Sequence, residues 1–267
     1  MNLSDFDYEL PEHFIAQHPL EPRDSSRLMV LNRAAQSIAH RTFRDIGDYL
    51  NAGDVLVMNS TRVIPARLEA IKPTGGKAEI LLLRQLDDTR WHVLVGGRGL
   101  HEGVTVTFEN ADVTATITAE LENAEREVTF SQPVNALLSQ IGQMPLPPYI
   151  HEKLEDSERY QTVYSREEGS AAAPTAGLHF TPELLLALRD KGVQLAYSVL
   201  HVGLDTFAPV RVDKITDHKM HSERAYLSAP NAKIINDAKL SGNRIIAVGT
   251  TTVRTLETAA ILSAGGD

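Results

Sequence analysis

The feature that most constrains the fold of this chain is a change in its hydrophobic period between residues 63 and 132. In this stretch apolar and polar residues alternate in six short runs, and glycine and polar turn residues separate most of them. Alternation with a period of two is typical of strands. Six short strands in succession predict a small antiparallel barrel or sandwich. The strands are expected at 66–72, 77–83, 90–95, 104–108, 113–121 and 127–130.

On both sides of this stretch, helical and strand-like segments alternate, which is typical of a mostly parallel sheet with helices packed against it. A short helix is expected at 134–141, and three prolines in the string PLPPYI at 145–150 then mark a linker. We therefore predict an α/β fold: a main domain with a mostly parallel sheet, residues 1–62 and 149–267, interrupted by an inserted antiparallel β-barrel domain, residues 63–148. The main domain is expected to contain strands at 27–31, 54–58, 193–200, 225–227 and 244–248 and helices at 43–50, 182–191, 231–240 and 251–262.

Composition excludes several classes of protein. With 42% hydrophobic and 23% charged residues the chain lies in the globular range, so disorder and fibrous repeats are poor interpretations. No apolar run approaches the ~18 residues that a membrane helix needs, and the acidic start MNLSDFDYEL does not match a secretory signal. We therefore predict a soluble, cytoplasmic protein with no membrane partner. The absence of cysteine excludes disulfides, thiolate nucleophiles and cysteine-ligated metal centres.

Charge is unevenly distributed along the chain. The net charge is −9, from 35 acidic and 26 basic residues, whereas a nucleic-acid-binding domain is usually basic. Between Arg62 and Arg98, however, seven basic residues stand against four acidic ones, so this stretch alone carries +3. A solvated strand face explains such an excess, and a surface for an anionic partner is the other interpretation.

The string HKMHSE, residues 218–223, gathers nitrogen and oxygen donors. His218 and His221 are three residues apart, and Glu223 follows two residues later. Three interpretations stay open: exposed loop histidines, a metal site, or an acid–base pair in which Glu223 orients His221. The last interpretation depends on residues i and i+2 lying on the same side of an extended chain. The spacing is not one of the standard zinc patterns.

The string APTAGLHFT leads into a predicted helix. Thr181 before Pro182 is an ordinary N-cap with proline at the first helical position. That explanation does not cover Thr175, Gly177 and His179. Small residues beside an imidazole at a helix entrance are compatible with a binding loop for an anionic or polar group.

Two further polar groups follow predicted strands of the main domain. If those strands are parallel neighbours, both groups lie at the same edge of the sheet, where ligands of open α/β sheets bind. The helix N-terminus that follows the second strand favours a carboxylate or phosphate. Neither GxGxxG nor GxxxxGK[ST] occurs, so no ordinary dinucleotide or P-loop site is indicated. The groups are Asn59, Thr61 and Arg62 after the first strand and Thr250, Thr251 and Arg254 after the second.

Taken together and in order, nine strings resemble the motif set of the S-adenosylmethionine:tRNA ribosyltransferase-isomerase family. The resemblance covers essentially the whole chain. The strings are EPRDSSRLMVL at 21–31, MNSTRVIPARL at 58–68, TGGK at 74–77, PLPPYI at 145–150, RYQTVY at 159–164, APTAGLHFT at 173–181, LHVGLDTF at 200–207, MHSE at 220–223 and VGTTTVRTLE at 248–257.

This resemblance implies an enzyme of queuosine biosynthesis with S-adenosylmethionine as co-substrate and no prosthetic group. Such an enzyme transfers the ribosyl part to the aminomethyl group of 7-aminomethyl-7-deazaguanine in a tRNA anticodon, releases adenine and methionine, and leaves epoxyqueuosine. The expected partners are S-adenosylmethionine and that tRNA, and the protein is expected to be a monomer. The family fold, an α/β domain with an inserted barrel, agrees with the organisation predicted above. The stretch from Arg62 to Arg98 is then expected to face RNA.

The implied chemistry needs a base for the acidic proton beside the sulfonium, a proton donor for adenine, and polar groups that hold the opened ribose. We expect acid–base work from His221 with Glu223 and from His179. No metal is required, because a sulfonium leaving group is already activated. Substrate binding is expected from Arg23, Asp24, Arg27, Asn59, Thr61, Arg62, Thr175, Gly177, His201, Thr250, Thr251 and Arg254.

The chain departs from the family pattern at two positions. Ser60 stands where the family usually has Asp, and Asp205 stands where it usually has Gly. Family members also continue beyond VGTTTVRTLE into a TNFHLP-like string, so we expect this sequence to be a fragment. Two alternatives follow: a non-catalytic tRNA-binding relative without that segment, and a metal-dependent hydrolase that uses His218, His221 and Glu223.

Overall fold

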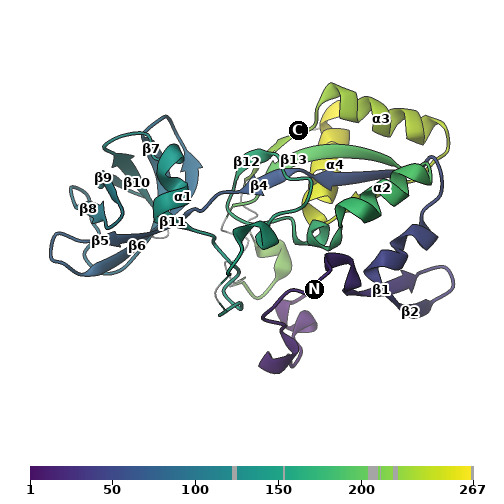
Figure 1. Cartoon of the computed structure of the whole chain (residues 1–267), viewed down its shortest axis with the longest axis horizontal. Helices are drawn as coiled ribbons and strands as arrows, with labels where there is room; N and C mark the ends of the chain where they lie inside the picture. Colours follow the sequence, from purple (N-terminus) through teal and green to yellow (C-terminus); the bar gives the residue numbers. More distant parts are fainter. Residues whose placement is uncertain (122–124, 153, 204–209, 211, 219–221, 266–267) are drawn as a thin grey trace.

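The protein consists of two lobes, an α/β domain and a closed antiparallel barrel (Figure 1). The computed structural model describes residues 1–121, 125–152, 154–203, 210, 212–218 and 222–265. The predicted fold class is confirmed, because a mostly parallel sheet with helices stands beside a barrel of antiparallel strands. Among the described residues, no helix is both long and apolar enough to cross a membrane.

The α/β domain is built on a four-stranded sheet in the order β14-β13-β3-β15. β3 lies in the middle, and all five of its residues are buried, as expected for a parallel strand covered on both faces. β13 and β15 run parallel to β3, whereas β14 is antiparallel to β13. The strands span β3 Val55–Asn59, β13 Gln194–His201, β14 Arg224–Tyr226 and β15 Ile245–Val248.

Helices cover both faces of this sheet. α2, Pro182–Asp190, packs on one face in a cluster with Phe43 and Phe180. α3, Ala229–Leu240, and α4, Thr250–Ser263, cover the other face, where their side chains pack against alternate residues of β3 and β13. Thr181 caps α2 as predicted, because its Oγ1 accepts a hydrogen bond from the Leu184 N–H at 3.1 Å.

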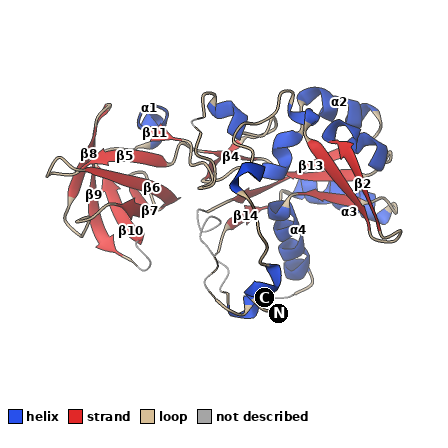
Figure 2. Ribbon diagram, turned by 90° about the horizontal axis from the view of Figure 1, so that it is seen from below, coloured by secondary structure: helices blue, strands red, loops and turns tan. Residues whose placement is uncertain are grey.

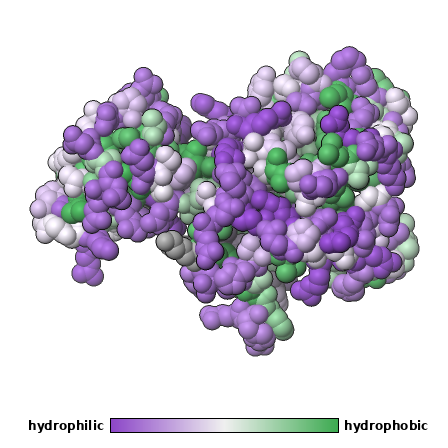
Figure 3. Space-filling view, viewed as in Figure 1, coloured by the Kyte–Doolittle hydropathy of each residue, from purple (hydrophilic) through white to green (hydrophobic). Residues whose placement is uncertain are grey.

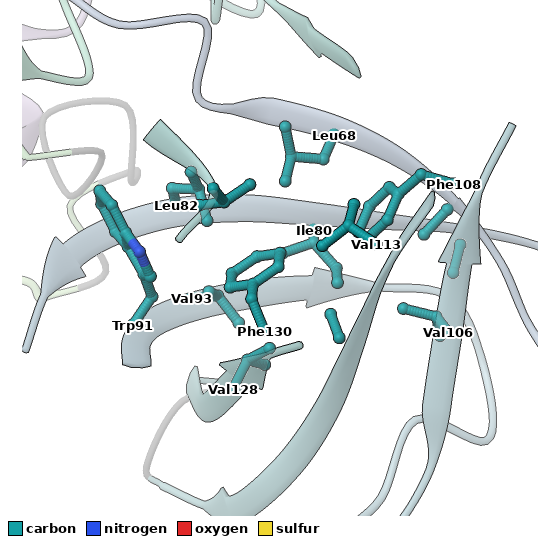
Figure 4. Packing of buried hydrophobic residues seen from close by; sticks show 14 of the residues in the cluster. Leu68, Ile80, Leu82, Trp91, Val93, Val106, Phe108, Val113, Val128 and Phe130 are labelled. Atoms are coloured by element: carbon teal, nitrogen blue, oxygen red, sulfur yellow. The ribbon is translucent and has the colours of Figure 1, made fainter. Parts of the chain in front are cut away.

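The second lobe is a six-stranded barrel in which every predicted strand is present. The strand order is β5-β6-β7-β10-β9-β8, and pairing of β5 with β8 closes it. Alternate side chains point inward and fill the interior, with the rings of Phe108 and Phe130 stacked at 6.2 Å (Figure 4). The strands are β5 Arg67–Ile71, β6 Lys77–Gln85, β7 Arg90–Gly96, β8 Thr105–Phe108, β9 Ala111–Glu120 and β10 Glu125–Phe130.

Two predicted helices take a different form. The segment expected at 43–50 is a 3₁₀ helix, Phe43–Tyr49, whose first turn is held by a Thr42–Asp45 capping box. The segment expected at 134–141 is a 3₁₀ turn, Asn135–Leu137, followed by the single turn α1, Leu138–Ile141. Both segments are too short for an α-helix to be stable without extensive packing.

Several short strands were not predicted. β2, Ser37–Thr42, forms a hairpin with β1, Arg27–Asn32, which was predicted, and β11, Gly142–Gln143, adds to β5 of the barrel. β4, Thr61–Val63, pairs in parallel with β12, Glu167–Ser170. β2 is mostly exposed and lacks clear alternation, and β4 and β11 have only two or three residues, so no periodic signal exists.

The connection between the lobes runs through β4, which lies between the sheet and the barrel in both views (Figures 1 and 2). The buried amide of Gln161 clamps this strand. Its Oε1 accepts from the Val63 N–H at 3.0 Å and its Nε2 donates to the Val63 carbonyl at 2.8 Å. The barrel strands lie within the predicted insert, while its limits at residues 63 and 148 stay a prediction.

Candidate functional site

The carboxyl ends of β3, β13 and β15 meet at one edge of the sheet. Ser198 of β13 lies opposite Asn59 of β3, and Val248 of β15 lies opposite Met58. The polar residues that follow β3 and β15 therefore share this edge, which is the arrangement that the sequence analysis assumed. Hydrophilic residues are abundant on the surface where the two lobes meet (Figure 3).

The side chain of Asn59 extends the pairing of β3 with β13 beyond the last pair of the ladder. Its Nδ2 donates to the Leu200 carbonyl at 2.9 Å, and its Oδ1 accepts from the N–H groups of Leu200 at 3.0 Å and Thr61 at 3.2 Å. The residue is fully buried. Asn59 thus holds the sheet together where the chain turns into β4, and its predicted contact with substrate stays a prediction.

His201, the last residue of β13, is held by Thr61 of β4. The Oγ1 of Thr61 lies 2.8 Å from Nδ1 of the imidazole. Burial lowers the pKa of His201 below its usual value, and the positive charge of Arg224 acts in the same direction. The imidazole is therefore neutral at pH 7, and its other ring nitrogen has no hydrogen-bond partner among the described residues.

Gly169 is required for this arrangement, although sequence reasoning missed it. Its φ is +133°, and a Cβ there would lie 3.2 Å from Cε1 of His201. Both the backbone conformation and the close approach of the ring favour glycine. A glycine within a strand signals such an approach, but the sequence does not reveal that His201 is the neighbour.

Glu223 and Arg254, two predicted site residues from distant segments, form an ion pair. The carboxylate of Glu223 is only 6% exposed and pairs with Nη1 of Arg254 in α4. Its Oε1 also accepts a hydrogen bond from the Gly203 N–H at 3.0 Å, just after β13. His221 lies outside the described residues, so its acid–base role with Glu223 stays a prediction.

The N-terminus of α4 is open at the same edge. Gly249 takes the N-cap position with φ +84°, and no side chain of the described residues caps the helix. A Cβ on Gly249 would lie 3.3 Å from Cβ of Ala176, so the loop that contains Thr175 packs against this helix start. Thr250 is exposed, and the buried Oγ1 of Thr251 has no hydrogen-bond partner among the described residues. The first-turn N–H groups favour an anionic or polar group.

The predicted binding loop is the 3₁₀ helix Thr175–His179. Gly177 is buried against Tyr164, and a Cβ at this position would collide with the Tyr164 hydroxyl oxygen. Packing therefore gives a structural reason for this glycine, and its contact with substrate stays a prediction. The ring of His179 packs on Phe43 with centroids 5.2 Å apart, and burial lowers the pKa of the imidazole.

Arg23 ties together three segments near this loop. Its Nη1 donates to the carbonyls of Gln161 at 2.7 Å and Leu178 at 3.3 Å, and its Nη2 donates to the Glu158 carbonyl at 2.8 Å. Loss of solvation lowers the pKa of the guanidinium. Three of its donors are therefore engaged by the protein itself.

The other predicted residues of this region are dispersed. Arg62 pairs with the Glu158 carboxylate and donates to Ser165 Oγ at 3.0 Å. Asp24 lies 3.7 Å from an Arg44 nitrogen, and Arg27 is exposed at the start of β1. Substrate contacts by Arg62, Asp24 and Arg27 stay predictions.

A cavity of about 410 Å³ lies beside His201, between β13, β14 and β12. Sequence reasoning found His201 but missed the charged and aromatic side chains that line the cavity with it. These are Arg166, Glu167, Tyr197 and Tyr226. In the sequence, only the neighbouring RYQTVY string could have drawn attention to Arg166 and Glu167. The pairing of β12 with β4 brings these two residues to the cavity.

The basic stretch of the barrel is partly neutralised by ion pairs. Arg62, Arg67 and Arg90 have acidic partners. The other basic side chains of the stretch have no acidic partner within the described ranges; these are Lys72, Lys77, Arg84 and Arg98. Among them, Lys72 Nζ donates a hydrogen bond to the Arg98 carbonyl at 3.1 Å.

No group of three His, Asp or Glu side chains suited to a metal ion exists in the part of the chain that the structure describes. The metal alternative depends on His221, which lies outside that part. His218 is described and exposed.

Comparison with known proteins shows which family the chain is similar to. Residues 3–266 match the family model described as queuosine biosynthesis protein. Among solved structures, the chain is similar to the S-adenosylmethionine tRNA ribosyltransferase from Thermotoga maritima, with 39% sequence identity over 97% of this chain and 74% of that chain. The TM-score is 0.47, so the similarity to this structure is taken from the sequence alone.

Proposed function

Because the chain belongs to the queuosine biosynthesis protein family, we propose that it is an S-adenosylmethionine-dependent tRNA ribosyltransferase-isomerase. The ribosyl part of S-adenosylmethionine is transferred to the amine of 7-aminomethyl-7-deazaguanine in the tRNA anticodon and rearranged to the epoxycyclopentanediol of epoxyqueuosine. Adenine and methionine are released. The proposal requires two substrates, no prosthetic group and no metal.

The family match over residues 3–266, nearly the whole chain, is the observation that carries this proposal. The geometry supports it, because segments far apart in sequence meet at the carboxyl edge of the sheet. This edge is where open α/β sheets bind their ligands. It carries a neutral imidazole at His201, the Glu223–Arg254 ion pair and the uncapped start of α4.

These groups suit the parts of S-adenosylmethionine. The hydroxyls of an opened ribose need donors and acceptors, which His201 and Thr250 offer at the carboxyl edge. The open N–H groups of α4, together with its macrodipole, favour a negative group such as the carboxylate of the methionine part. Arg254 of the same helix pairs with the Glu223 carboxylate at this edge.

Acid–base work is assigned to His221 with Glu223 and to His179. The proton beside the sulfonium is acidic, and departing adenine gains a proton. Since burial lowers the pKa of His179, its imidazole is neutral at pH 7 and ready to accept a proton. The sulfonium leaves as the thioether of methionine, which is why no Lewis acid is needed.

The barrel is assigned to RNA binding. The basic residues without acidic partners in the described ranges suit phosphate contacts, and each phosphate contact makes binding weaker at higher salt. Lys72 and Arg98 lie in contact at one end of the barrel, and Lys77 begins the neighbouring strand.

The test is to incubate the purified chain with S-adenosylmethionine and an anticodon stem-loop that carries the aminomethyl-deazaguanine base. Mass spectrometry should detect adenine, methionine and RNA that has gained the ribosyl-derived mass. A stem-loop with guanine at this position lacks the nucleophilic amine and is the control. Release of neither adenine nor methionine, with RNA binding intact, would support a non-catalytic tRNA-binding protein instead.

Variants of the HKMHSE string test the acid–base assignment. His221→Ala should lower the single-turnover rate by about 10²-fold or more, as expected for loss of a general acid or base. His218→Ala, at an exposed position of the same string, is the matched control and should retain the rate. If His221→Ala retained it within about twofold, the assignment would be wrong. Loss of activity on treatment with a chelator would favour the metal alternative.

A further inference from the structure

The cavity beside His201 has the size and the walls of a ligand site. Its volume of about 410 Å³ lies in the range that small-molecule and cofactor sites occupy. Tyr197 and His201 point into it from the same face of β13, since they are four residues apart on one strand. Tyr226 of β14 pairs with Val199 of β13, so its side chain lines the cavity from the same face of the sheet.

Flat side chains dominate these walls. The guanidinium of Arg166 lies over the Tyr197 ring with its Cζ 4.6 Å from the ring centroid. Tyr226 is 65% exposed although it is large and aromatic. A planar heteroaromatic ring can stack on the outer face of the guanidinium or on the Tyr226 ring, and such stacking is a principal mode of single-stranded base recognition.

The cavity also contains two charged side chains without an ion-pair partner among the described residues. Arg166 and Glu167 are both exposed, and neither takes part in an ion pair within the described ranges. His201 is held by Thr61, and Glu167 lies close enough to the imidazole that its negative charge opposes the lowering of the His201 pKa by burial. The Glu167 carboxylate, with no ion-pair partner among the described residues, therefore lines the cavity beside aromatic rings.

We propose that this cavity receives the guanine-type base of the RNA substrate, stacked on Arg166 or Tyr226 and read by the Glu167 carboxylate. Two acceptor oxygens of a carboxylate match the adjacent N1–H and 2-amino donors on the edge of guanine and 7-deazaguanine. Adenine presents one acceptor and one donor on that edge, so its N1 would face a carboxylate oxygen. This inference rests on the proposed function, because that function supplies an RNA substrate with such a base.

The position of the cavity supports an RNA base rather than the adenine base of S-adenosylmethionine. Glu167 belongs to β12, which pairs with β4, and β4 leads directly into the barrel (Figures 1 and 2). The cavity is therefore next to the connection between the lobes. The open start of α4, which suits an anionic group, lies at the far side of β3.

The test compares binding of two anticodon stem-loops that differ only at the target position, one with guanine and one with inosine, which lacks the 2-amino group. The wild-type chain should bind the guanine stem-loop about tenfold more tightly, as expected for a hydrogen bond to a charged acceptor. Glu167→Gln should weaken binding of the guanine stem-loop by about tenfold and bring the ratio of the affinities for the guanine and inosine stem-loops close to one. Glu168→Gln, at the next position, which is also exposed, is the matched control and should leave this ratio of affinities unchanged.

A second variant separates stacking from edge recognition. Tyr226→Ala should weaken both stem-loops by a similar factor, because stacking does not distinguish the two bases. The proposal would be overturned if Glu167→Gln left the ratio of the affinities for the guanine and inosine stem-loops unchanged. A weaker affinity of Glu167→Gln for S-adenosylmethionine with unchanged RNA binding would also overturn it, since the cavity would then hold the other substrate. Ribosyl transfer by the wild-type chain is measured separately, so failure of the proposed function and failure of this site give different results.

Discussion

Asp54 is predicted to stabilise the end of the sheet opposite the candidate site, and replacing it with asparagine tests this. The carboxylate lies at the start of β3 and is 2% exposed. It accepts hydrogen bonds from the Asn51 N–H at 2.7 Å and from the backbone N–H and Nε of Arg244, each at 3.2 Å. It also forms an ion pair with Nη2 of Arg244. One side chain thus joins the starts of β3 and β15.

The pKa of Asp54 gives the expected loss of unfolding free energy in Asp54→Asn. The hydrogen bond from Arg244 lowers it from 3.8 to about 2, against the opposing effect of burial. At 1.36 kcal/mol per pKa unit this difference corresponds to about 2.4 kcal/mol. Arg244 is half-exposed, and water screens the pair, so we expect Asp54→Asn to lose about 2 kcal/mol at pH 7.

The pH dependence gives the sharper test. A carboxyl group whose pKa is lower in the folded state stabilises the protein above its unfolded pKa and loses this contribution as pH falls. The difference in unfolding free energy between wild type and Asp54→Asn should therefore be full at pH 7. It should fall to about half near pH 3 and continue to decrease toward pH 2. Urea denaturation followed by circular dichroism at several pH values measures it.

A matched control comes from the barrel. Asp87 also has a pKa lowered to about 2, by its hydrogen bond with Arg90, but the pair is exposed. Asp87→Asn should cost much less stability than Asp54→Asn, because solvent screens exposed pairs. Equal losses in the two variants, or a loss at position 54 that does not change between pH 7 and pH 3, would refute the reasoning.

Three further predictions concern the candidate site and the barrel. Gly177→Ala should destabilise the fold by about 1–3 kcal/mol in urea denaturation, as overpacking does, and Tyr164→Phe in the same chain should recover part of the loss. His201 should titrate below its usual pKa of 6.5 by NMR, because burial disfavours the imidazolium; a value above 6.5 would contradict its burial. Lys77→Ala should reduce the slope of log affinity for the stem-loop against log salt by roughly 0.7–0.9. Arg90→Ala, whose charge is already paired, should leave that slope nearly unchanged.

Local patterns predicted the elements of regular structure well. The barrel strands were all predicted, because period-two alternation is visible within four to ten residues. The buried run of β3 and the N-cap at Thr181 were equally local signals. The short strands β4 and β12 were missed, since neither has a pattern of its own and each is a strand only because the other lies beside it.

The sequence predicted many residues of the candidate site, but it did not predict which of them contact one another. Glu223 was expected to orient His221, yet its described partners include Arg254 of a distant helix. Arg166 and Glu167 had no signal of their own beyond their nearness to the RYQTVY string, because an arginine followed by a glutamate is an ordinary surface sequence. Their meaning depends on the cavity that β12 and β13 form together.

By itself, the sequence determined the division into a barrel and an α/β domain, the family, and which polar residues stand at strand ends. These properties depend on hydrophobic periodicity, on turn residues and on motif order, all of which are local or additive along the chain. Only the tertiary structure decided that the amide of Asn59 binds the backbone of Leu200 and that Gly169 makes room for His201. Such contacts join residues far apart in sequence, and the packing of the whole sheet determines which partners meet.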